Sequence, residues 1–328
     1  MDSIFKIFQN LKKQSSVNDE SFMVSSIPLI ENHKIGISKM EQPMFFIKCA
    51  DSANIKSLDS NLEFISVQFN RKCFLKTSEN EITEDFYSII SLKTDSFDLQ
   101  KYFLEIVYLF IKRLSNKPSL KELKIEVDTL INLFSKFSNP PIKTIQGLWA
   151  ELLIIEQSSN PDYLIRSWHI SKSDKFDFND GSDKLEIKST SKSRRIHNFS
   201  IEQLNPNENS SLIIASIFTI ETGVGKNIFG LVEGIEAKIK DKELYFRVNE
   251  IIVQTLGKDF EKSYDVFYDY QLAVDSIKYY YREVVPTINS LDIPSKLSNI
   301  RFDCDISEIQ DVKSCENESL LHSSIFKI

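Results

Sequence analysis

Two acidic residues and a lysine in the segment 174–200 have the types and spacing that metal-assisted chemistry needs. Glu186 and Lys188 lie two residues apart in the strand-like stretch KLEIK, so they point to the same face of a strand. Asp177 lies in a second stretch of alternating residues, just before a turn. A divalent cation assists phosphodiester hydrolysis because it neutralises phosphate charge and lowers the pKa of a water molecule. Mg²⁺ prefers carboxylate oxygens, so Asp177 and Glu186 are candidates to hold it.

The turn between the two stretches decides whether the carboxylates meet. An Asp-Gly pair at 180–181 is a strong turn signal. A four-residue loop over 180–183 would pair Asp177 with Glu186. A two-residue loop would instead pair Asp177 with Lys184 and leave Glu186 diagonal on the same face. Both registers keep the carboxylates within reach of one cation.

The acid-x-lysine triplet alone is weak support for a site, because the chain contains others, which begin at Glu122, Glu236 and Asp311. Strand context, apolar neighbours on the opposite face and an aspartate on the adjacent strand distinguish Glu186. The alternative interpretation is a solvated hairpin with cross-strand ion pairs, which contribute little stability.

The elements that must position these residues fall into four segments with different patterns. Residues 1–95 begin with an amphipathic helix and continue with strand-like stretches, which predicts a mostly β unit. Residues 96–139 carry apolar residues at helical spacing on both sides of a break, which predicts a helical pair. Residues 140–260 alternate helix, strands and helix, which predicts a core with a mixed sheet. Residues 261–328 form a C-terminal extension that ends in a polar tail.

After residue 40 we expect two helices within 98–137 and one helix each at 144–157 and 244–256. The strands expected in the same region are 44–50, 62–69, 72–77, 211–220 and 277–285.

The composition of the 328 residues excludes several classes of protein. Only 8 residues are glycine, and no G-x-x-x-x-G-K-[ST] or G-x-G-x-x-G motif occurs, which argues against an ATPase or a dinucleotide-dependent dehydrogenase. The four cysteines are widely spaced and indicate free thiols in a reducing compartment. The longest apolar run, 212–218, is too short to span a bilayer, and no signal peptide is recognisable. We therefore expect a cytoplasmic protein without a membrane segment.

A local concentration of positive charge accompanies the candidate site. The net charge of −7 argues against a general grip on nucleic acid. Between residues 184 and 197, however, the sequence contains one anion, Glu186, and five cations: Lys184, Lys188, Lys192, Arg194 and Arg195. Such a cluster beside a metal site suits contacts with phosphate, although a run of this kind is usually a solvated loop.

The order of these motifs resembles a known group of enzymes. Asp177 followed by Glu186-Ile187-Lys188 resembles the PD-(D/E)XK nuclease superfamily, with Phe176 in place of the proline that gives the superfamily its name. A closer resemblance is to a prokaryotic family of PD-(D/E)XK proteins found in restriction-like and phage-defence operons. It covers about 140–235 well and is carried by the segments 147–152, Trp168, 177–178, 185–190 and 196–204.

The resemblance implies an α/β (α+β) fold. We expect a restriction-endonuclease-like core with a mixed central sheet flanked by helices, preceded by an N-terminal region that is β-rich and helical.

The resemblance also implies roles for individual residues. Asp177, Glu186 and the backbone carbonyl of Ile187 would ligate Mg²⁺ or Mn²⁺. Lys188 would position the attacking water and stabilise developing negative charge. Glu151 matches the acidic residue that many members supply from the preceding helix.

Two assignments remain open around this set. Glu151 lies on the flank of the apolar stripe of helix 144–157, and Glu156, nearer its middle, is the alternative acid. Substrate-binding roles fall on Lys192, Arg194 and Arg195, which would contact phosphate, and on His197 and Gln203, which would orient substrate or water.

The function implied is a Mg²⁺-dependent endonuclease that cleaves DNA in a phage-defence or restriction system. ATPase- or helicase-type partner proteins of the same operon would deliver the substrate, and an oligomer is compatible with this role. One alternative is a non-catalytic subunit whose nuclease-like domain binds nucleic acid or a partner protein. A second alternative is a nuclease for RNA. No module that reads the 2′-hydroxyl is recognisable, so the sequence does not decide between DNA and RNA.

Overall fold

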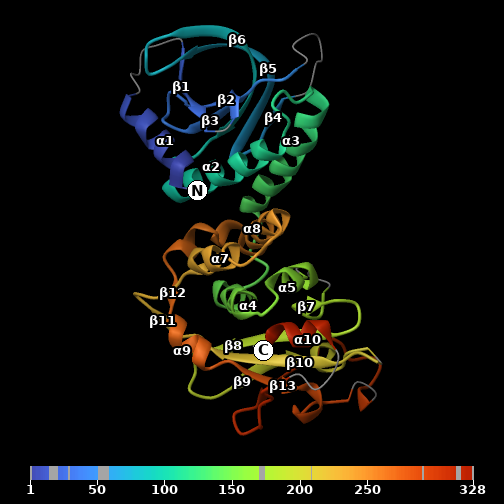
Figure 1. Cartoon of the computed structure of the whole chain (residues 1–328). Helices are drawn as coiled ribbons and strands as arrows, with labels where there is room; N and C mark the ends of the chain where they lie inside the picture. Colours follow the sequence, from blue (N-terminus) through green and yellow to red (C-terminus); the bar gives the residue numbers. More distant parts are fainter. Residues whose placement is uncertain are drawn as a thin grey trace. The chain divides into compact units, whose positions relative to one another are not determined.

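The computed structural model describes residues 2–14, 21–28, 30–50, 59–169, 174–207, 209–289, 292–314 and 319–326. The chain divides into two compact units, Met1–Ser138 and Asn139–Ile328 (Figure 1). No helix among the described residues is both long enough and apolar enough to cross a membrane.

The N-terminal unit contains a sheet that closes on itself. Its strands are β1 (Phe22–Ile27), β2 (Ile30–Ile37), β3 (Pro43–Ile47), β4 (Ser60–Asn61), β5 (Ile65–Lys76) and β6 (Ile82–Leu92). The hydrogen-bonded order is β1-β2-β3-β6-β5, and β5 then pairs with β1 to complete a ring of five strands, with β4 attached to β5. The stretches expected at 62–69 and 72–77 belong to the single strand β5.

A bulge in β5 allows this closure. The register with β6 shifts between Gln68 and Arg71, and Asn70 in this interval has a φ of 48°. Asparagine tolerates this left-handed conformation better than most residues. Because a bulge bends its strand and increases the local twist, the far end of β5 can reach β1, where Leu75 pairs with Phe22.

Two capped helices complete the N-terminal unit, as the apolar periodicity predicted. The side chain of Ser96 accepts a hydrogen bond from Leu99 at the start of α2 (Phe97–Arg113), and Ser119 caps α3 (Leu120–Ser135). A short 3₁₀ turn, Lys136–Ser138, ends the unit, which also contains the N-terminal helix α1 (Asp2–Gln14). Buried aromatic rings, including Phe45 from β3 and Phe103 from α2, pack the helices against the sheet.

The C-terminal unit is built around a mixed four-stranded sheet with the order β13-β10-β8-β7. The strands are β7 (Phe178–Asn179), β8 (Lys184–Thr190), β10 (Leu212–Phe218) and β13 (Lys278–Tyr281). β8 and β10 are parallel, whereas β7 and β13 pair antiparallel with their neighbours. The fold is therefore the α+β arrangement with a mixed sheet that the sequence predicts.

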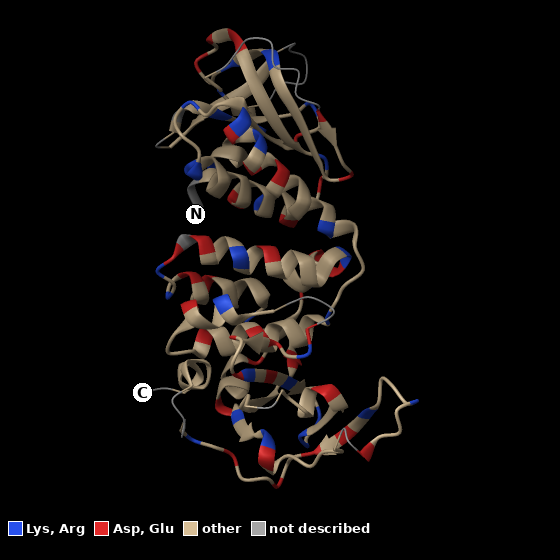
Figure 2. Ribbon diagram, turned by 90° about the vertical axis from the view of Figure 1, so that its right-hand side faces the viewer, with Lys and Arg blue, Asp and Glu red and all other residues tan. Residues whose placement is uncertain are grey.

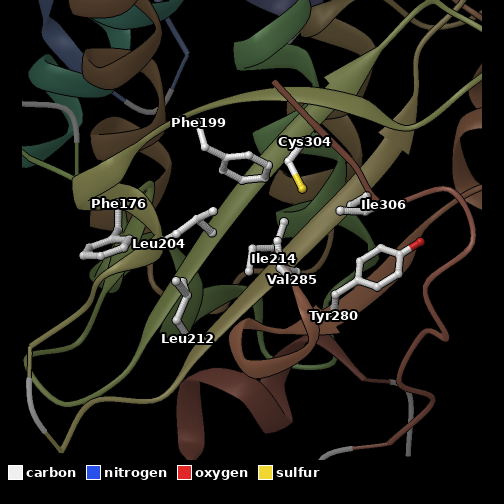
Figure 3. Packing of buried hydrophobic residues seen from close by; sticks show 9 residues of the cluster. All are labelled: Phe176, Phe199, Leu204, Leu212, Ile214, Tyr280, Val285, Cys304 and Ile306. Atoms are coloured by element: carbon white, nitrogen blue, oxygen red, sulfur yellow. The ribbon is translucent and has the colours of Figure 1, made fainter. Parts of the chain in front are cut away.

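Both faces of this sheet are covered. One face packs against α4 (Ile145–Gln157), which is apolar around most of its circumference and buried along its length (Figure 1). The other face carries the two-stranded ribbon of β9 (Ile196–Ser200) and β14 (Arg301–Asp305). Figure 3 shows the buried cluster on this side: Phe176, Phe199, Leu204, Leu212, Ile214, Tyr280, Val285, Cys304 and Ile306.

The remaining elements surround this core. They are α5 (Pro161–Ser167), α6 (Ile201–Leu204), β11 (Glu221–Thr222), α7 (Ile228–Glu236), α8 (Lys242–Leu256), β12 (Phe267–Tyr268), α9 (Tyr270–Asp275) and α10 (Leu320–Ile325), with 3₁₀ turns at Gly257–Asp259, Glu261–Tyr264 and Arg282–Val284.

The structure differs from the sequence expectation at two places in this unit. The stretch between the expected strand 211–220 and the expected helix 244–256, for which no helix was expected, contains α7, capped by Asn227. The segment expected to be a polar tail contains α10, which is largely buried because the ring of His322 hydrogen-bonds to the carbonyl of Lys184 at 2.9 Å and Ser324 accepts from Ser158.

The two glycines of α7 provide a test of its packing against α4. A Cβ at Gly234 would lie 2.8 Å from Oε1 of buried Glu156, which Tyr270 holds by a hydrogen bond of 3.0 Å. A Cβ at Gly230 would meet nothing closer than 3.6 Å. Gly234→Ala should therefore lower the free energy of unfolding by about 1 kcal/mol through overpacking, whereas Gly230→Ala should raise it by about 0.5 kcal/mol. Urea denaturation of both variants checks this, and a stabilised Gly234→Ala variant would contradict it.

Candidate active site

The turn before β8 sets the register of the candidate site. The side chain of Asp180 accepts hydrogen bonds from the amides of Ser182 at 2.9 Å and Asp183 at 2.8 Å, and Gly181 has a φ of 96°. The loop therefore has four residues and pairs Asn179 with Lys184. This is the first of the two registers considered from the sequence, and it sets Asp177 opposite Glu186.

Asp177 lies at the open edge of β8. Its Oδ2 accepts a hydrogen bond of 2.8 Å from the amide of Ile187. Because β7 has only two residues, the carboxylate takes the hydrogen bond that a longer partner strand would have accepted. Asp177 is 8% exposed, so its charge is largely removed from water.

Glu186 and Lys188 lie on the same face of β8, joined by Gln203. Nζ of Lys188 is 2.9 Å from Oε1 of Glu186 and donates to Oε1 of Gln203 at 3.1 Å. Nε2 of Gln203 donates to the same oxygen of Glu186 at 2.5 Å. The three side chains therefore form a closed network, in which the amide holds both charged groups.

The capping box of α6 holds Gln203 in place. Ser200 accepts a hydrogen bond from the amide of Gln203, and the side chain of Gln203 accepts one from the amide of Ser200. The ammonium of Lys188 also lies 4.9 Å from the ring centroid of Phe199 on β9. The end of β9 and the start of α6 thus support the lysine from one side.

Glu151 approaches the site from α4, which packs against the sheet. It is 3% exposed, and its Oε2 accepts a hydrogen bond of 2.7 Å from the indole of Trp168. Its alternative, Glu156, instead contacts Tyr270 and Lys226 in a separate polar cluster. The structure therefore brings Glu151, and not Glu156, to the candidate site.

Lys143 joins the two acids, and sequence reasoning missed it. Its Nζ lies 2.6 Å from Oε1 of Glu151 and 2.5 Å from Oδ1 of Asp177. The residue lies just before Thr144, the N-cap of α4. A cation is unfavourable at a helix N-terminus because the helix dipole is positive there. A lysine at this position was therefore a signal that an acidic partner lies nearby.

Burial raises the pKa of both glutamates. It raises the pKa of Glu151 to about 8; the charge of Asp177 adds to the rise and Lys143 opposes it. Burial likewise raises the pKa of Glu186 to about 7; Asp177 adds to the rise and Lys188 opposes it. Burial lowers the pKa of Lys143, but the two carboxylates outweigh this effect and hold the pKa above its ordinary value. Burial therefore favours the protonated form of both glutamates, whereas a cation beside them favours the charged form.

The donor atoms of the site suit a hard divalent cation. Oε2 of Glu186 is buried and has no hydrogen-bond partner. The other expected donors are the carboxylate of Asp177 and the carbonyl of Ile187, and Mg²⁺ and Mn²⁺ prefer such oxygens. Within the described ranges, no three Asp, Glu, His or Cys side chains converge closely enough to hold a metal as they stand. Lys143 provides the positive charge between two of the acids.

The cations expected to bind substrate divide into two groups. Lys192 and Arg194 are exposed in the loop after β8, and Arg194 pairs with Asp305. Figure 2 shows acidic and basic residues interspersed along the ribbon of each unit. The binding of phosphate by Lys192 and Arg194 stays a prediction.

Arg195 and His197 lie inside the unit. The guanidinium of Arg195 donates to the carbonyl of Ser216 at 2.7 Å and to its hydroxyl at 2.8 Å. Nε2 of His197 lies 2.7 Å from the same hydroxyl. Burial, Lys188 and Arg195 lower the pKa of His197 to about 4, so it is neutral near pH 7. Of the five residues assigned to substrate, only Gln203 directly contacts the acid–lysine pair of β8.

The pH dependence of stability tests the buried charge of Glu186. Its pKa is about 7 in the folded protein against an ordinary value of 4.5, so the folded state binds more protons between these values. The contribution of this group to stability is full below the unfolded pKa and is lost as the pH rises through the folded pKa. Glu186→Gln removes this titration, so between about pH 5 and about pH 8 the variant should lose less free energy of unfolding than wild type, by roughly 3 kcal/mol. Urea unfolding of both proteins in EDTA measures the difference, and equal losses would rule the explanation out.

One comparison with known proteins gave a match. A family model described as "Putative PD-(D/E)XK family member, (DUF4420)" matches residues 4–307. No curated protein and no solved structure matches the chain. The match extends into both units and includes every residue of the candidate site. The chain therefore belongs to the DUF4420 family, which is described as a putative PD-(D/E)XK family.

Proposed function

We propose that the protein is a Mg²⁺-dependent nuclease that hydrolyses phosphodiester bonds in DNA. The observation that carries this proposal is the convergence on β8 of Asp177, Glu186 and Lys188, held in one register by the four-residue turn and by Gln203. A solvated hairpin would leave these side chains exposed, whereas the side chains of Asp177 and Glu186 are only 11% and 2% exposed.

Each residue has a distinct task in the proposed reaction. Asp177, Glu186 and the carbonyl of Ile187 would hold the cation, which would act as a Lewis acid on phosphate and lower the pKa of a bound water. The side chain of Lys188 is 15% exposed, so Lys188 contacts both Glu186 and the solvent. It can orient a water molecule and stabilise negative charge as that charge develops on phosphate. Gln203 fixes the ammonium in this position.

The exposed cations after β8 supply the contact with the DNA backbone. Lys192 and Arg194 lie two and four residues beyond the end of the strand that carries the site. Phosphate contacts of this kind fix a nucleic acid in place without reading its sequence. We propose that this loop compensates locally for the acidic net charge of the chain.

The biological setting we propose is a cytoplasmic phage-defence or restriction system. The resemblance to families found in such operons supports this setting. Partner proteins of the ATPase or helicase type would then deliver DNA to the nuclease.

Substitution of the three site residues tests the chemistry. Purified wild type should cleave plasmid, linear or single-stranded DNA in Mg²⁺ or Mn²⁺ but not in EDTA. Asp177→Asn, Glu186→Gln and Lys188→Met should each reduce the cleavage rate by about a hundredfold or more, because the first two remove a charged metal ligand and the third removes the ammonium that stabilises negative charge on phosphate. Lys124→Met, an exposed lysine of another acid-x-lysine triplet, is the matched control and should retain full activity.

Two results would count against this function. Full activity in all three site variants would exclude the proposed site. If the wild type neither cleaves DNA nor binds Mn²⁺ in calorimetry, a non-catalytic subunit becomes the better explanation. If it binds Mn²⁺ through Asp177 without cleaving DNA, the result favours either delivery of the substrate by partner proteins or a non-catalytic subunit.

The contribution of the loop after β8 can be measured separately. Substitution of Lys192 and Arg194 together by alanine should weaken DNA binding and reduce the slope of log affinity against log salt by about 1 to 2, because two phosphate contacts are lost. Lys258→Ala, an exposed lysine elsewhere in the same unit, should leave the slope unchanged. Fluorescence anisotropy with labelled DNA in EDTA at several salt concentrations gives both slopes. Identical slopes for all three proteins would remove these residues from the interface.

A further inference from the structure

Lys143 competes directly for the oxygens that a cation needs. Oδ2 of Asp177 is engaged by the amide of Ile187, and Oδ1 is engaged by the ammonium of Lys143. Both oxygens of Glu151 are also engaged, by Lys143 and by the indole of Trp168. A cation that takes Asp177 as a ligand through Oδ1 must therefore replace the ammonium there.

The backbone on both sides of Lys143 is anchored, so its side chain is the part that can move. The amide of Ile142 donates to the carbonyl of Thr255 at 2.7 Å, and Thr144 caps α4 by accepting from the amide of Gly147 at 3.1 Å. The side chain is 27% exposed, in contrast to the 11% and 4% of its partners Asp177 and Glu151. A flexible four-carbon stem can carry the ammonium towards water without any change in the backbone.

The remaining acid of the site is placed differently. Glu186 pairs with Lys188 through Oε1, and its Oε2 is buried without a partner. Glu186 can therefore accept a cation without losing its lysine, whereas Asp177 gives up a contact with Lys143. The two expected ligands thus respond differently to metal binding.

We propose that Lys143 is a built-in counter-ion that occupies the acid pair in the metal-free protein and must leave Asp177 when a divalent cation binds. Lys143 thereby sets the metal concentration at which the site loads. It is a positioning residue, and the proposal rests on the metal site of the proposed function. With a competing internal cation, the apparent affinity for metal is the intrinsic affinity multiplied by the fraction of molecules in which the site is open.

Mn²⁺ binding to the full-length protein tests this inference without any measurement of cleavage. Isothermal titration calorimetry of Lys143→Met should give a dissociation constant about tenfold lower than that of wild type, because no ammonium has to be displaced. Lys143→Arg keeps the charge and should bind Mn²⁺ more weakly than Lys143→Met. Lys226→Met is the matched control. Lys226 pairs with Glu156, which lies on α4 like Glu151, so this substitution should leave the affinity unchanged.

A second pair of variants protects the test against misfolding. Lys143→Met leaves two buried carboxylates without their shared lysine, which destabilises the metal-free protein. Glu151→Gln and the double variant Lys143→Met/Glu151→Gln remove one of these charges. The double variant should bind Mn²⁺ more tightly than Glu151→Gln alone.

The outcomes separate this inference from the proposed function. If wild type binds Mn²⁺ and the Lys143 substitutions leave the affinity unchanged or weaken it, the counter-ion role is overturned while the metal site stands. If Lys143→Met binds Mn²⁺ and wild type binds it far more weakly, the role is supported. If none of the proteins binds Mn²⁺, both the role and the metal-dependent function are overturned.

Discussion

The burial of three carboxylates at one edge of a sheet is the constraint on which the rest of the C-terminal unit depends. Glu151, Asp177 and Glu186 are each at most 8% exposed. An isolated buried carboxylate is strongly unfavourable, so each acid requires a donor or a counter-charge within hydrogen-bond distance. Those partners come from separate parts of the chain: the segment before α4, the end of α5, β8 itself and the start of α6. The arrangement of these elements around the sheet follows from this requirement.

The hairpin that joins β7 to β8 turns this requirement into a defined geometry. A one-residue shift in register would send Glu186 to the opposite face of the sheet, away from Gln203. The side chain of Asp180 prevents the shift because it binds two amides within the turn. The short β7 then leaves the amide of Ile187 open to Asp177. The turn and the short length of β7 together place Asp177 and Glu186 close to each other at the edge of β8.

Local pattern was sufficient to predict the parts of the site that depend on short-range periodicity. The alternation of KLEIK identified the shared face of Glu186 and Lys188, and the helical spacing of 144–157 identified α4. The sequence left two registers open, because Asp-Gly is compatible with both loop lengths and only the hydrogen bonds of Asp180 distinguish them. Closure of the N-terminal sheet depends on the bulge at Asn70 and a short parallel pairing, which leave no periodic signal.

Contacts between distant segments could not be predicted. Lys143 and Asp177 are 34 residues apart; the position of Lys143 before a helix indicates an acidic partner, but no periodic pattern identifies Asp177 as that partner. Arg194 and Arg195 are neighbours of the same charge in the sequence, although Arg195 is buried and Arg194 is exposed. Whether a loop residue faces water depends on what packs against it, here the β14 strand and Ser216.

All the residues of the candidate site lie in the C-terminal unit. The boundary between the two units falls after Ser138, and Lys143, Glu151, Asp177, Glu186, Lys188 and Gln203 all lie beyond it. The segment that leads to Lys143 is tied to the end of α8, because Asn139 accepts from the amide of Lys258 and Ile142 donates to Thr255. The hydrogen-bond and ion-pair partners described above for Glu151, Asp177 and Glu186 therefore all come from the C-terminal unit. The covalent path that links the elements of the site therefore runs entirely beyond Ser138, within a single unit.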